Sequence, residues 1–301
     1  MSKGKEIIDQ SGRKIVVKQP FKRIISLYGA HTENLLSLGL EQEIIGTACN
    51  EADSEAIIKK PCFSYRDDPE KFLSVHPDLV LIRPMIERSY PRLISRLLKS
   101  KITVVSIQPG TIDEMLKYWM ILGALTGKEK QSQCMVATFK EAKEGFSGLA
   151  KDIAVRKKVY FEAIHDKMKT FTKDSMAIFV LETAGGINIA ADAKQVRTTN
   201  IAFYGKERLL TKAGQVDAYI AQSGTMNKPS ISLIKNEPGY QVIKAIQNDQ
   251  IFIVDEMIVS RPTMGLLYGI YEIGRFLYPE IFCERAAIIL DSSKNKMGGC
   301  H

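Results

Sequence analysis

A sequence motif that occurs once in each half of the chain most constrains its fold. Residues 68–82 and residues 205–221 each contain a short amphipathic helical segment, a Pro or Gly break, and an apolar strand. The helical segments are led by Glu70 and Glu207, and the strands are opened by Asp78 and Asp217. A duplicated unit predicts two similar lobes, and paired lobes commonly hold a ligand between them. The repeat therefore indicates a binding protein before it indicates an enzyme.

Strands and helices alternate on both sides of a long helical stretch. Before the helical stretch, apolar strands are expected at 23–27, 44–48, 79–82 and 103–107. After it, strands are expected at 158–164 and 251–254. Helical patterns separate these strands, and such alternation is typical of an open, mainly parallel α/β sheet. We therefore expect the α/β class, with two Rossmann-like lobes and mainly parallel sheets.

The helical stretch lies between the two halves. Its apolar residues recur at helical spacing, among them Met115, Trp119, Phe139 and Phe146, and no strand signal interrupts them. A stretch of this kind predicts a long, rigid helical connector. The expected division is an N-terminal lobe over 1–110, the connector over 111–152, a C-terminal lobe over 153–290, and a flexible tail over 291–301.

Composition and charge narrow the functional classes. Apolar residues make up 45% and charged residues 25% of the 301 residues, which is ordinary for a globular protein. The net charge of +8 is scattered without a basic block, so no nucleic-acid partner is expected. No apolar run approaches the roughly 20 residues of a membrane span, and residues 1–8 lack the apolar core of a signal peptide. The protein is then either cytoplasmic or a mature form whose leader has been removed.

The usual signatures of enzymes and metal sites are missing from the sequence. It contains no P-loop, no G-x-G-x-x-G, no H-E-x-x-H and no nucleophile elbow. The four histidines are too scattered to suggest a local metal site. The five cysteines include no C-x-x-C; Cys49 and Cys62 could close a loop, but free, packed thiols are the favoured interpretation.

Several weak signals follow one another along the chain in a recognisable order. They are Asp9-Gln-Ser-Gly-Arg13, Phe21-Lys-Arg-Ile-Ile-Ser26, Thr32-Glu-Asn-Leu-Leu-Ser-Leu-Gly39, Pro77-Asp-Leu-Val80, Gly185-Gly-Ile-Asn-Ile-Ala190, and Arg261-Pro262 leading to Tyr278-Pro-Glu280. With these signals the chain, from roughly residue 6 to 286, resembles the substrate-binding protein of the iron-complex and cobalamin class of ABC importers, which has the class III periplasmic-binding-protein fold. The resemblance implies two α/β lobes joined by a rigid helix, with a ligand cleft between them. It also implies a monomeric, non-enzymatic receptor in the periplasm or on the cell surface as a lipoprotein, its leader absent from this sequence.

The duplicated glutamates have two interpretations. Acidic residues favour helix N-termini through the helix dipole, which alone would explain Glu70 and Glu207. In the resembling family, the glutamate at the matching position of each lobe docks onto arginines of the membrane permease. Because the feature is duplicated and charge complementarity orients partners, we favour docking to an ABC permease.

The resemblance also implies a set of ligand-binding residues. Loops at the carboxyl ends of strands present ligands in α/β folds, and in this family such loops line the cleft. The candidates are Tyr28, His31, Tyr65, Arg66, Arg83, His165 and Arg261. The tyrosines and histidines would supply aromatic faces or axial ligands, and the arginines would supply counter-charge. For each residue, capping, packing or surface exposure is the alternative role.

The cargo expected from these residues is a metal chelate, with no intrinsic cofactor in the protein. A ferric siderophore or haem fits a mixture of Tyr, His and Arg better than a corrinoid, which requires mostly apolar contacts. His165 matches the place where some haem receptors of the family carry an axial histidine. A bare oxyanion such as molybdate stays open as an alternative. A two-lobed metal-cofactor enzyme is a more distant one, since the cysteines show no cluster-ligating spacing.

Overall fold

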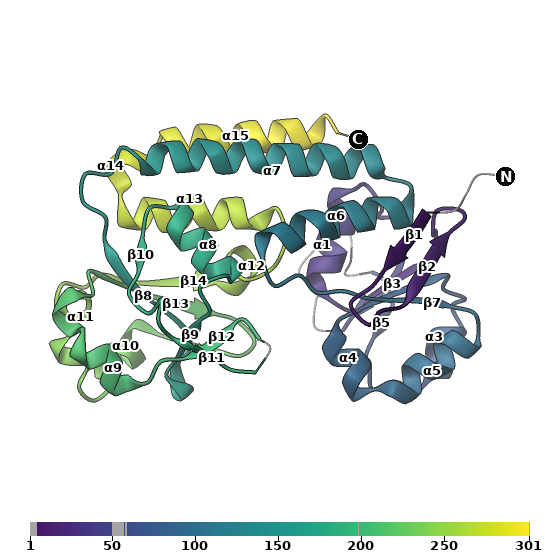
Figure 1. Ribbon diagram of the computed structural model, residues 1–301, viewed down its shortest axis with the longest axis horizontal. Coiled ribbons are helices and arrows are strands. Elements are labelled where there is room, and N and C mark those ends of the chain that lie inside the picture. Colours follow the sequence, from purple (N-terminus) through teal and green to yellow (C-terminus); the bar gives the residue numbers. More distant parts are fainter. Residues whose placement is uncertain (1–4, 50–56, 58, 198, 301) are drawn as a thin grey trace. The chain divides into compact units, whose positions relative to one another are not determined.

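The protein is described from a computed structural model (Figure 1), within which residues 5–49, 57, 59–197 and 199–300 are described. The chain divides into two compact units. Unit 1 comprises Met1–Pro109, Asp113–Val136 and Met297–His301, and unit 2 comprises Gly110–Ile112 and Ala137–Lys296. Both units are α/β, as the sequence predicts.

Unit 1 is built on a five-stranded parallel sheet with the order β5-β4-β3-β6-β7. The strands are β3 (Ile24–Ser26), β4 (Ile44–Ala48), β5 (Cys62–Phe63), β6 (Leu79–Ile82) and β7 (Thr103–Ser106). All four residues of β6 are fully buried, which explains why this strand is a continuous apolar run rather than an alternating one. The helices are α1 (Gly29–Ser37), α3 (Pro69–Leu73), α4 (Pro84–Ser89), α5 (Pro91–Lys99) and α6 (Ile112–Thr126), and β1 (Lys5–Ile8) pairs with β2 (Lys14–Val17) in an antiparallel hairpin.

Unit 2 contains a seven-stranded mixed sheet. Its strands are β8 (Lys158–Ile164), β9 (Lys169–Phe171), β10 (Ile187–Asn188), β11 (Lys194–Gln195), β12 (Ile201–Phe203), β13 (Ala218–Ser223) and β14 (Ile251–Asp255). The order is β11-β12-β9-β8-β13-β14, and β10 also pairs with β8. The pairings of β8 with β10 and β13, and of β13 with β14, are parallel, whereas β9, β11 and β12 pair antiparallel. The antiparallel part departs from the expected parallel pattern because a tight turn, with Met168 at a φ of 46°, returns the chain directly from β8 to β9.

The remaining helices of unit 2 follow the strands along the chain. They are α8 (Met176–Thr183), α9 (Lys206–Thr211), α10 (Ile231–Asn236), α11 (Lys244–Gln247), α12 (Glu256–Val259), α13 (Gly265–Leu277), α14 (Pro279–Phe282) and α15 (Arg285–Gly298). Short 3-10 turns occur at His165–Lys167, Ala213–Gln215 and Tyr240–Val242. No helix in the described residues is both long enough and apolar enough to cross a membrane.

Helices occupy the stretch between the two halves of the sequence. After α6, helix α7 (Glu129–Ala150) carries the chain from unit 1 into unit 2. The prediction of a flexible tail from Asp291 was wrong, since residues up to Gly298 belong to α15. Ion pairs of Lys296 with Glu141 and of Arg285 with Asp152 hold α15 beside α7 (Figure 1).

Four of the five cysteines form disulfides, contrary to the free thiols favoured from the sequence. Cys49 pairs with Cys62, with a Cα–Cα distance of 4.6 Å, and Cys134 pairs with Cys300. The first pair depends on the register of β4 against β5, which sets Thr47 opposite Cys62 and brings the end of β4 beside that cysteine. Such a register cannot be read from the spacing of two cysteines. Cys283 is free and exposed.

The repeated aspartates share one structural role. The carboxylate of Asp78 accepts hydrogen bonds from the backbone amides of Lys22 and Arg23, at 2.8 and 2.9 Å, just before β3. The carboxylate of Asp217 accepts from the amide of Lys158, at 2.8 Å, at the start of β8. Each aspartate thus fixes the start of the strand that pairs with its own. Part of the sequence repeat therefore serves the fold of each unit.

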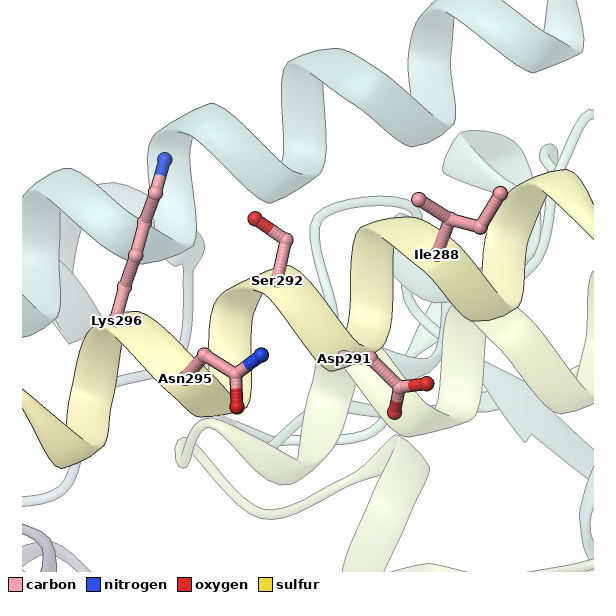
Figure 2. A pocket seen from close by; sticks show the side chains of 5 residues that line it. All are labelled: Ile288, Asp291, Ser292, Asn295 and Lys296. Atoms are coloured by element: carbon pink, nitrogen blue, oxygen red, sulfur yellow. The ribbon is translucent and has the colours of Figure 1, made fainter.

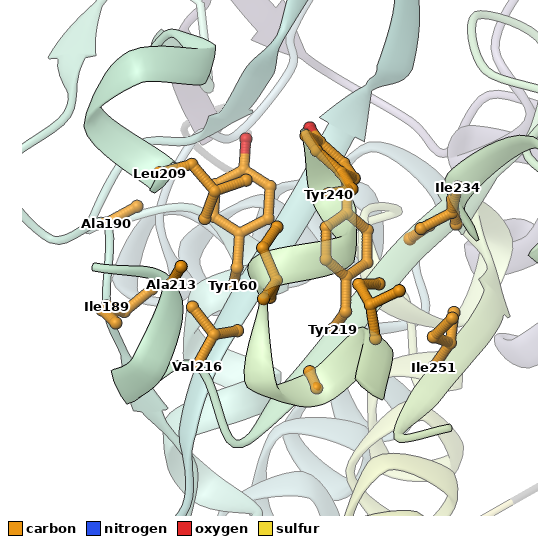
Figure 3. Close-up of a cluster of buried hydrophobic side chains, with 14 of the residues drawn as sticks. Tyr160, Ile189, Ala190, Leu209, Ala213, Val216, Tyr219, Ile234, Tyr240 and Ile251 are labelled. Atoms are coloured by element: carbon orange, nitrogen blue, oxygen red, sulfur yellow. The ribbon is translucent and has the colours of Figure 1, made fainter. Parts of the chain in front are cut away.

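The core of unit 2 contains an aromatic group that shapes its polar interior. Tyr160, Tyr219 and Tyr240 lie side by side among aliphatic residues (Figure 3). The ring centroids of Tyr160 and Tyr219 are 5.3 Å apart, and those of Tyr219 and Tyr240 are 5.9 Å apart. Buried phenol groups require hydrogen-bond partners. The hydroxyl of Tyr219 donates a hydrogen bond to the buried carboxylate of Glu162. This bond belongs to a polar network inside unit 2.

Candidate functional site

Two predicted ligand residues meet at the carboxyl edge of the unit 1 sheet. Strands β3 and β6 are parallel neighbours, so the residues that follow them, Tyr28 and Arg83, lie side by side. The guanidinium carbon of Arg83 is 4.8 Å from the centroid of the Tyr28 ring, a cation–π contact. Both residues are half-buried, and within the described residues the Nε of Arg83 has no hydrogen-bond partner. This pair therefore sets an aromatic ring and a guanidinium group side by side at the edge of the sheet.

A second group at this sheet contains a residue that the sequence interpretation missed. Tyr65 and Arg66 follow β5, and the Tyr65 ring centroid lies 4.7 Å from that of Tyr90. Arg66 donates from Nε to the Tyr90 hydroxyl at 3.4 Å, and its guanidinium carbon is 5.9 Å from the Tyr65 ring. Tyr90 lies between α4 and α5, where only its position before Pro91 marks it. The structure thus adds Tyr90 to Tyr65 and Arg66 as an aromatic–guanidinium group.

His31 packs inside unit 1 instead of facing an open ligand position. It is fully buried in α1, with Nδ1 2.7 Å from the Tyr118 hydroxyl and Nε2 3.3 Å from the carbonyl oxygen of Ile82. Burial, and to a smaller extent the charge of Arg83, lower the pKa of His31 to about 3 against the opposing effect of the hydrogen bond to the Ile82 carbonyl. The imidazole is therefore neutral, with both nitrogens occupied inside unit 1, and it contributes to packing rather than to an open ligand position.

His165 lies in the polar network of unit 2, at the carboxyl end of β8. Its side chain is buried, and Nδ1 lies 2.8 Å from an oxygen of Glu162, a strand residue that is only 1% exposed. Asn227 donates to the Glu162 carboxylate at 3.3 Å and accepts from the backbone amide of His165 at 3.0 Å. The hydrogen bond to Glu162 raises the pKa of His165 despite the opposing effect of burial, and nearby carboxylates raise it further.

The other ring nitrogen of His165 faces a second carboxylate. Its Nε2 is 3.6 Å from an oxygen of Glu237 and, within the described residues, has no hydrogen-bond partner. Lys206, at the start of α9, holds the other Glu237 oxygen at 2.5 Å. His165 therefore lies between two acids inside unit 2. Glu162 was missed because its position within an apolar strand gives no sign of a polar environment.

Arg261 lies in the segment between α12 and α13 of unit 2. It is half-buried, and its carbonyl oxygen accepts a hydrogen bond from the amide of Thr263 at 2.9 Å. The position before Pro262 restricts its backbone, which fixes the direction of the segment. Arg261 stays a prediction as a ligand residue.

The duplicated glutamates are both exposed, one in each unit, as expected. Glu70 lies in the first turn of α3, whose N-terminus is capped by Asp68, and its side chain is 65% exposed. It forms an ion pair with Arg96 at 2.7 Å. Glu207 lies in the first turn of α9 and is exposed. Within the part of the chain that the structure describes, its carboxylate forms no ion pair or hydrogen bond, so the two acids differ in availability.

A shallow depression lies on the surface of α15, and none of the predicted ligand or docking residues lines it. Figure 2 shows its lining, which consists of Ile288, Asp291, Ser292, Asn295 and Lys296. All five residues come from one helix. A surface of this kind lacks the enclosure and converging polar groups of a ligand site.

Comparison with known proteins places the chain in a family. The model of the periplasmic binding protein family matches residues 24–257. An uncharacterized ABC transporter substrate-binding lipoprotein, YvrC of Bacillus subtilis, is 26% identical over 284 residues, covering 92% of this chain and 87% of the relative. The vitamin B12-binding protein of Vibrio cholerae is 23% identical over 262 residues, covering 86% of this chain and 90% of that protein.

Solved structures agree with this assignment of the fold. A protein described as a possible iron-binding, periplasmic solute-binding protein from Staphylococcus epidermidis superposes with a TM-score of 0.74 at 24% identity. The match covers 86% of this chain and all of that one. The predicted class III fold with two α/β lobes is thereby confirmed. The chain belongs to the periplasmic binding protein family, the substrate-binding components of ABC importers, which serve transport and are not enzymes.

Proposed function

We propose that this protein captures a metal chelate outside the cytoplasm and delivers it to the permease of an ABC importer. The observation that carries the proposal is the pairing of aromatic rings with guanidinium groups at the carboxyl edge of the unit 1 sheet. Arg83 lies over Tyr28, and Arg66 lies beside Tyr65 and Tyr90. Rings pack against the flat organic parts of a chelate, and guanidinium groups bind its carboxylate or phenolate oxygens.

The proposed cargo is a ferric siderophore or haem, and a corrinoid ranks behind them. Solved relatives include a protein described as a possible iron-binding protein and a vitamin B12-binding protein of Vibrio cholerae, which supports a metal complex as the cargo. The ring nitrogens of His31 are occupied, and His165 is buried between two acids. We therefore propose recognition by charge and ring stacking in unit 1, rather than axial ligation by either histidine.

Two disulfides support an extracytoplasmic location. Cys49 is bonded to Cys62, and Cys134 is bonded to Cys300. Structural disulfides persist in oxidising compartments and are rare in the cytosol of most organisms. Together with the similarity to a substrate-binding lipoprotein, they favour the periplasm or the outer face of the cell membrane. Periplasmic and lipid-anchored forms are distinguished by fractionating cells and labelling lipid-modified cysteine.

The proposed docking residues are Glu70 and Glu207, which meet cationic groups of the permease. Each is exposed, and one lies in each unit. Exposed carboxylates steer and orient a partner of opposite charge, and they contribute little to the binding of a ligand elsewhere. Replacing both with Ala should leave ligand affinity unchanged and abolish delivery to the permease. Loss of ligand binding in the double variant would contradict the docking role.

The ligand site is tested by comparing two arginines of unit 1. Charge-assisted hydrogen bonds contribute about 1.5–3 kcal/mol each, so Arg83→Ala should weaken a bound ferric tris-catecholate or haemin by about tenfold or more. The matched control is Arg92→Ala, since Arg92 is an exposed residue of α5 in the same unit. Affinity is measured by isothermal titration calorimetry. Equal affinities for the two variants would contradict the proposed site.

A further inference from the structure

An exposed aromatic ring lies next to the docking acid of unit 2. Phe203 ends strand β12 and is 53% exposed, whereas its neighbour Ala202 is fully buried. Gly205 lies between this ring and Glu207: a side-chain carbon built on Gly205 would be 3.5 Å from the ring and 3.7 Å from a Glu207 carboxylate oxygen. The ring and the carboxylate therefore border the same glycine. Burying this ring against a partner would remove apolar surface from water, which is favourable.

The strand register places two cations beside the same ring. Phe203 pairs with Lys194 of β11 on one side and with Lys169 of β9 on the other. Directly opposed residues of antiparallel strands project from the same face of a sheet. The ring therefore lies between two lysine side chains on the outer face of β12.

The charges around Glu207 on its own helix are already paired with other residues. Lys206 pairs with Glu237, and Arg208 pairs with Asp192. Glu207 itself forms no ion pair among the residues that the structure describes. The surface thus presents one apolar ring, two lysines and one uncommitted carboxylate. Its complement is an apolar pocket with a cation on one side and acidic groups at its rim.

We propose that Phe203 is the apolar anchor of the surface through which unit 2 docks on the permease of its importer. This inference rests on the docking role proposed for Glu207, because the ring and the carboxylate form one continuous surface. Buried aromatic side chains dominate the energetics of protein interfaces, and charges around them contribute mainly orientation and association rate. An anionic lipid surface fits less well, since it would attract the lysines but repel the carboxylate beside the ring.

The test measures binding of the disulfide-intact, 301-residue chain to its importer. The importer is reconstituted in nanodiscs of phosphatidylcholine, and binding is followed by biolayer interferometry. Phe203→Ser should weaken this binding by about tenfold or more, while Phe203→Leu, which keeps apolar bulk, should restore most of the affinity. The matched control is Val155→Ser, because Val155 is an apolar residue of unit 2 that is 81% exposed. Thermal unfolding by circular dichroism verifies that the variants are folded, and calorimetry with haemin verifies that the ligand site is unchanged.

The outcomes separate this inference from the proposed function. Weakened docking in Phe203→Ser, with Val155→Ser unaffected, supports the anchor. Unchanged docking in Phe203→Ser overturns it, even if Glu207→Ala abolishes docking and so upholds the acid. Loss of docking in Phe203→Ser with no effect of Glu207→Ala keeps the anchor and overturns the role of the acid. If Phe203→Ser instead lowers binding only to protein-free vesicles containing phosphatidylglycerol, the ring contacts lipid and the anchor is overturned.

Discussion

Replacing His165 should destabilise unit 2 in a manner that depends on pH. The imidazole hydrogen-bonds Glu162 at 2.8 Å, and both side chains are almost fully buried. Removing one member of a buried ion pair costs about 3–5 kcal/mol, because the remaining charge is left buried and uncompensated. Glu162 keeps hydrogen bonds from Tyr219 and Asn227 in the His165→Asn variant. We therefore expect the lower end of that range, about 3 kcal/mol, while His165 is protonated in the wild-type protein.

The direction of the pH effect follows from the charge of the pair. The hydrogen bond to Glu162 raises the pKa of His165 in the folded protein above its ordinary value. Folding therefore favours the protonated form, and this contribution to stability is complete below the unfolded-state pKa of about 6.5. It is lost as the pH rises through the raised folded-state pKa. The deficit of His165→Asn should fall from about 3 kcal/mol at pH 6 toward about 1 kcal/mol, the value of a neutral hydrogen bond, at higher pH.

The assay combines urea unfolding with amide hydrogen exchange at pH 6 and pH 9. Exchange should accelerate in β8 and β13 of the variant, while α6, which carries Trp119 and lies almost wholly in unit 1, serves as the internal reference. The matched control is His76→Asn, because His76 has a φ of 47°, which Asn tolerates, and lies in the other unit. An equal deficit at both pH values would refute the charge pairing, and a larger deficit at pH 9 would reverse the assigned sign.

Two further perturbations test the structure of the units. Asp217→Ala should cost about 1–3 kcal/mol of unfolding free energy, since the amide of Lys158 loses its acceptor and Lys244 loses its ion-pair partner. Asp78→Ala should cost a similar amount because two amides depend on that carboxylate. Urea unfolding that shows no loss of stability in either variant would contradict the role of these aspartates in fixing the starts of β3 and β8. Cys134→Ser should lower stability by about 2–4 kcal/mol through loss of a disulfide, seen as a lower melting temperature, whereas Cys283→Ser should be neutral because Cys283 is exposed and free. Equal melting temperatures for the two cysteine variants would contradict this assignment.

Strands β3, β4, β6 and β7 of unit 1 were predictable from the sequence because each is a mainly apolar segment. Strand β6 is buried on both faces, so its four residues are all aliphatic. Strand β11 (Lys194–Gln195) is short, polar and exposed, and it carries no such signal. Its existence depends on pairing with β12, a tertiary contact that propensity does not reveal. The antiparallel part of unit 2 was missed for this reason.

The sequence predicts which candidate residues follow neighbouring strands, but not which residues they contact. Strand ends correctly place Tyr28 beside Arg83, since parallel neighbours end at a common edge. The burial of His31 depends on Tyr118, which is 87 residues away in the sequence. No local pattern shows that this distant hydroxyl occupies the imidazole. Environments made by remote residues decide whether a histidine packs or binds.

The most direct measurement of the central claim is a calorimetric titration of the disulfide-intact, 301-residue protein with haemin, ferric siderophores, cobalamin and molybdate. The account predicts tight binding of one ferric chelate at a ratio of one to one, weaker binding of cobalamin, and loss of at least tenfold in affinity in Arg83→Ala. Tight binding of molybdate alone would replace the chelate with a bare oxyanion. Failure of every metal complex to bind would contradict the account.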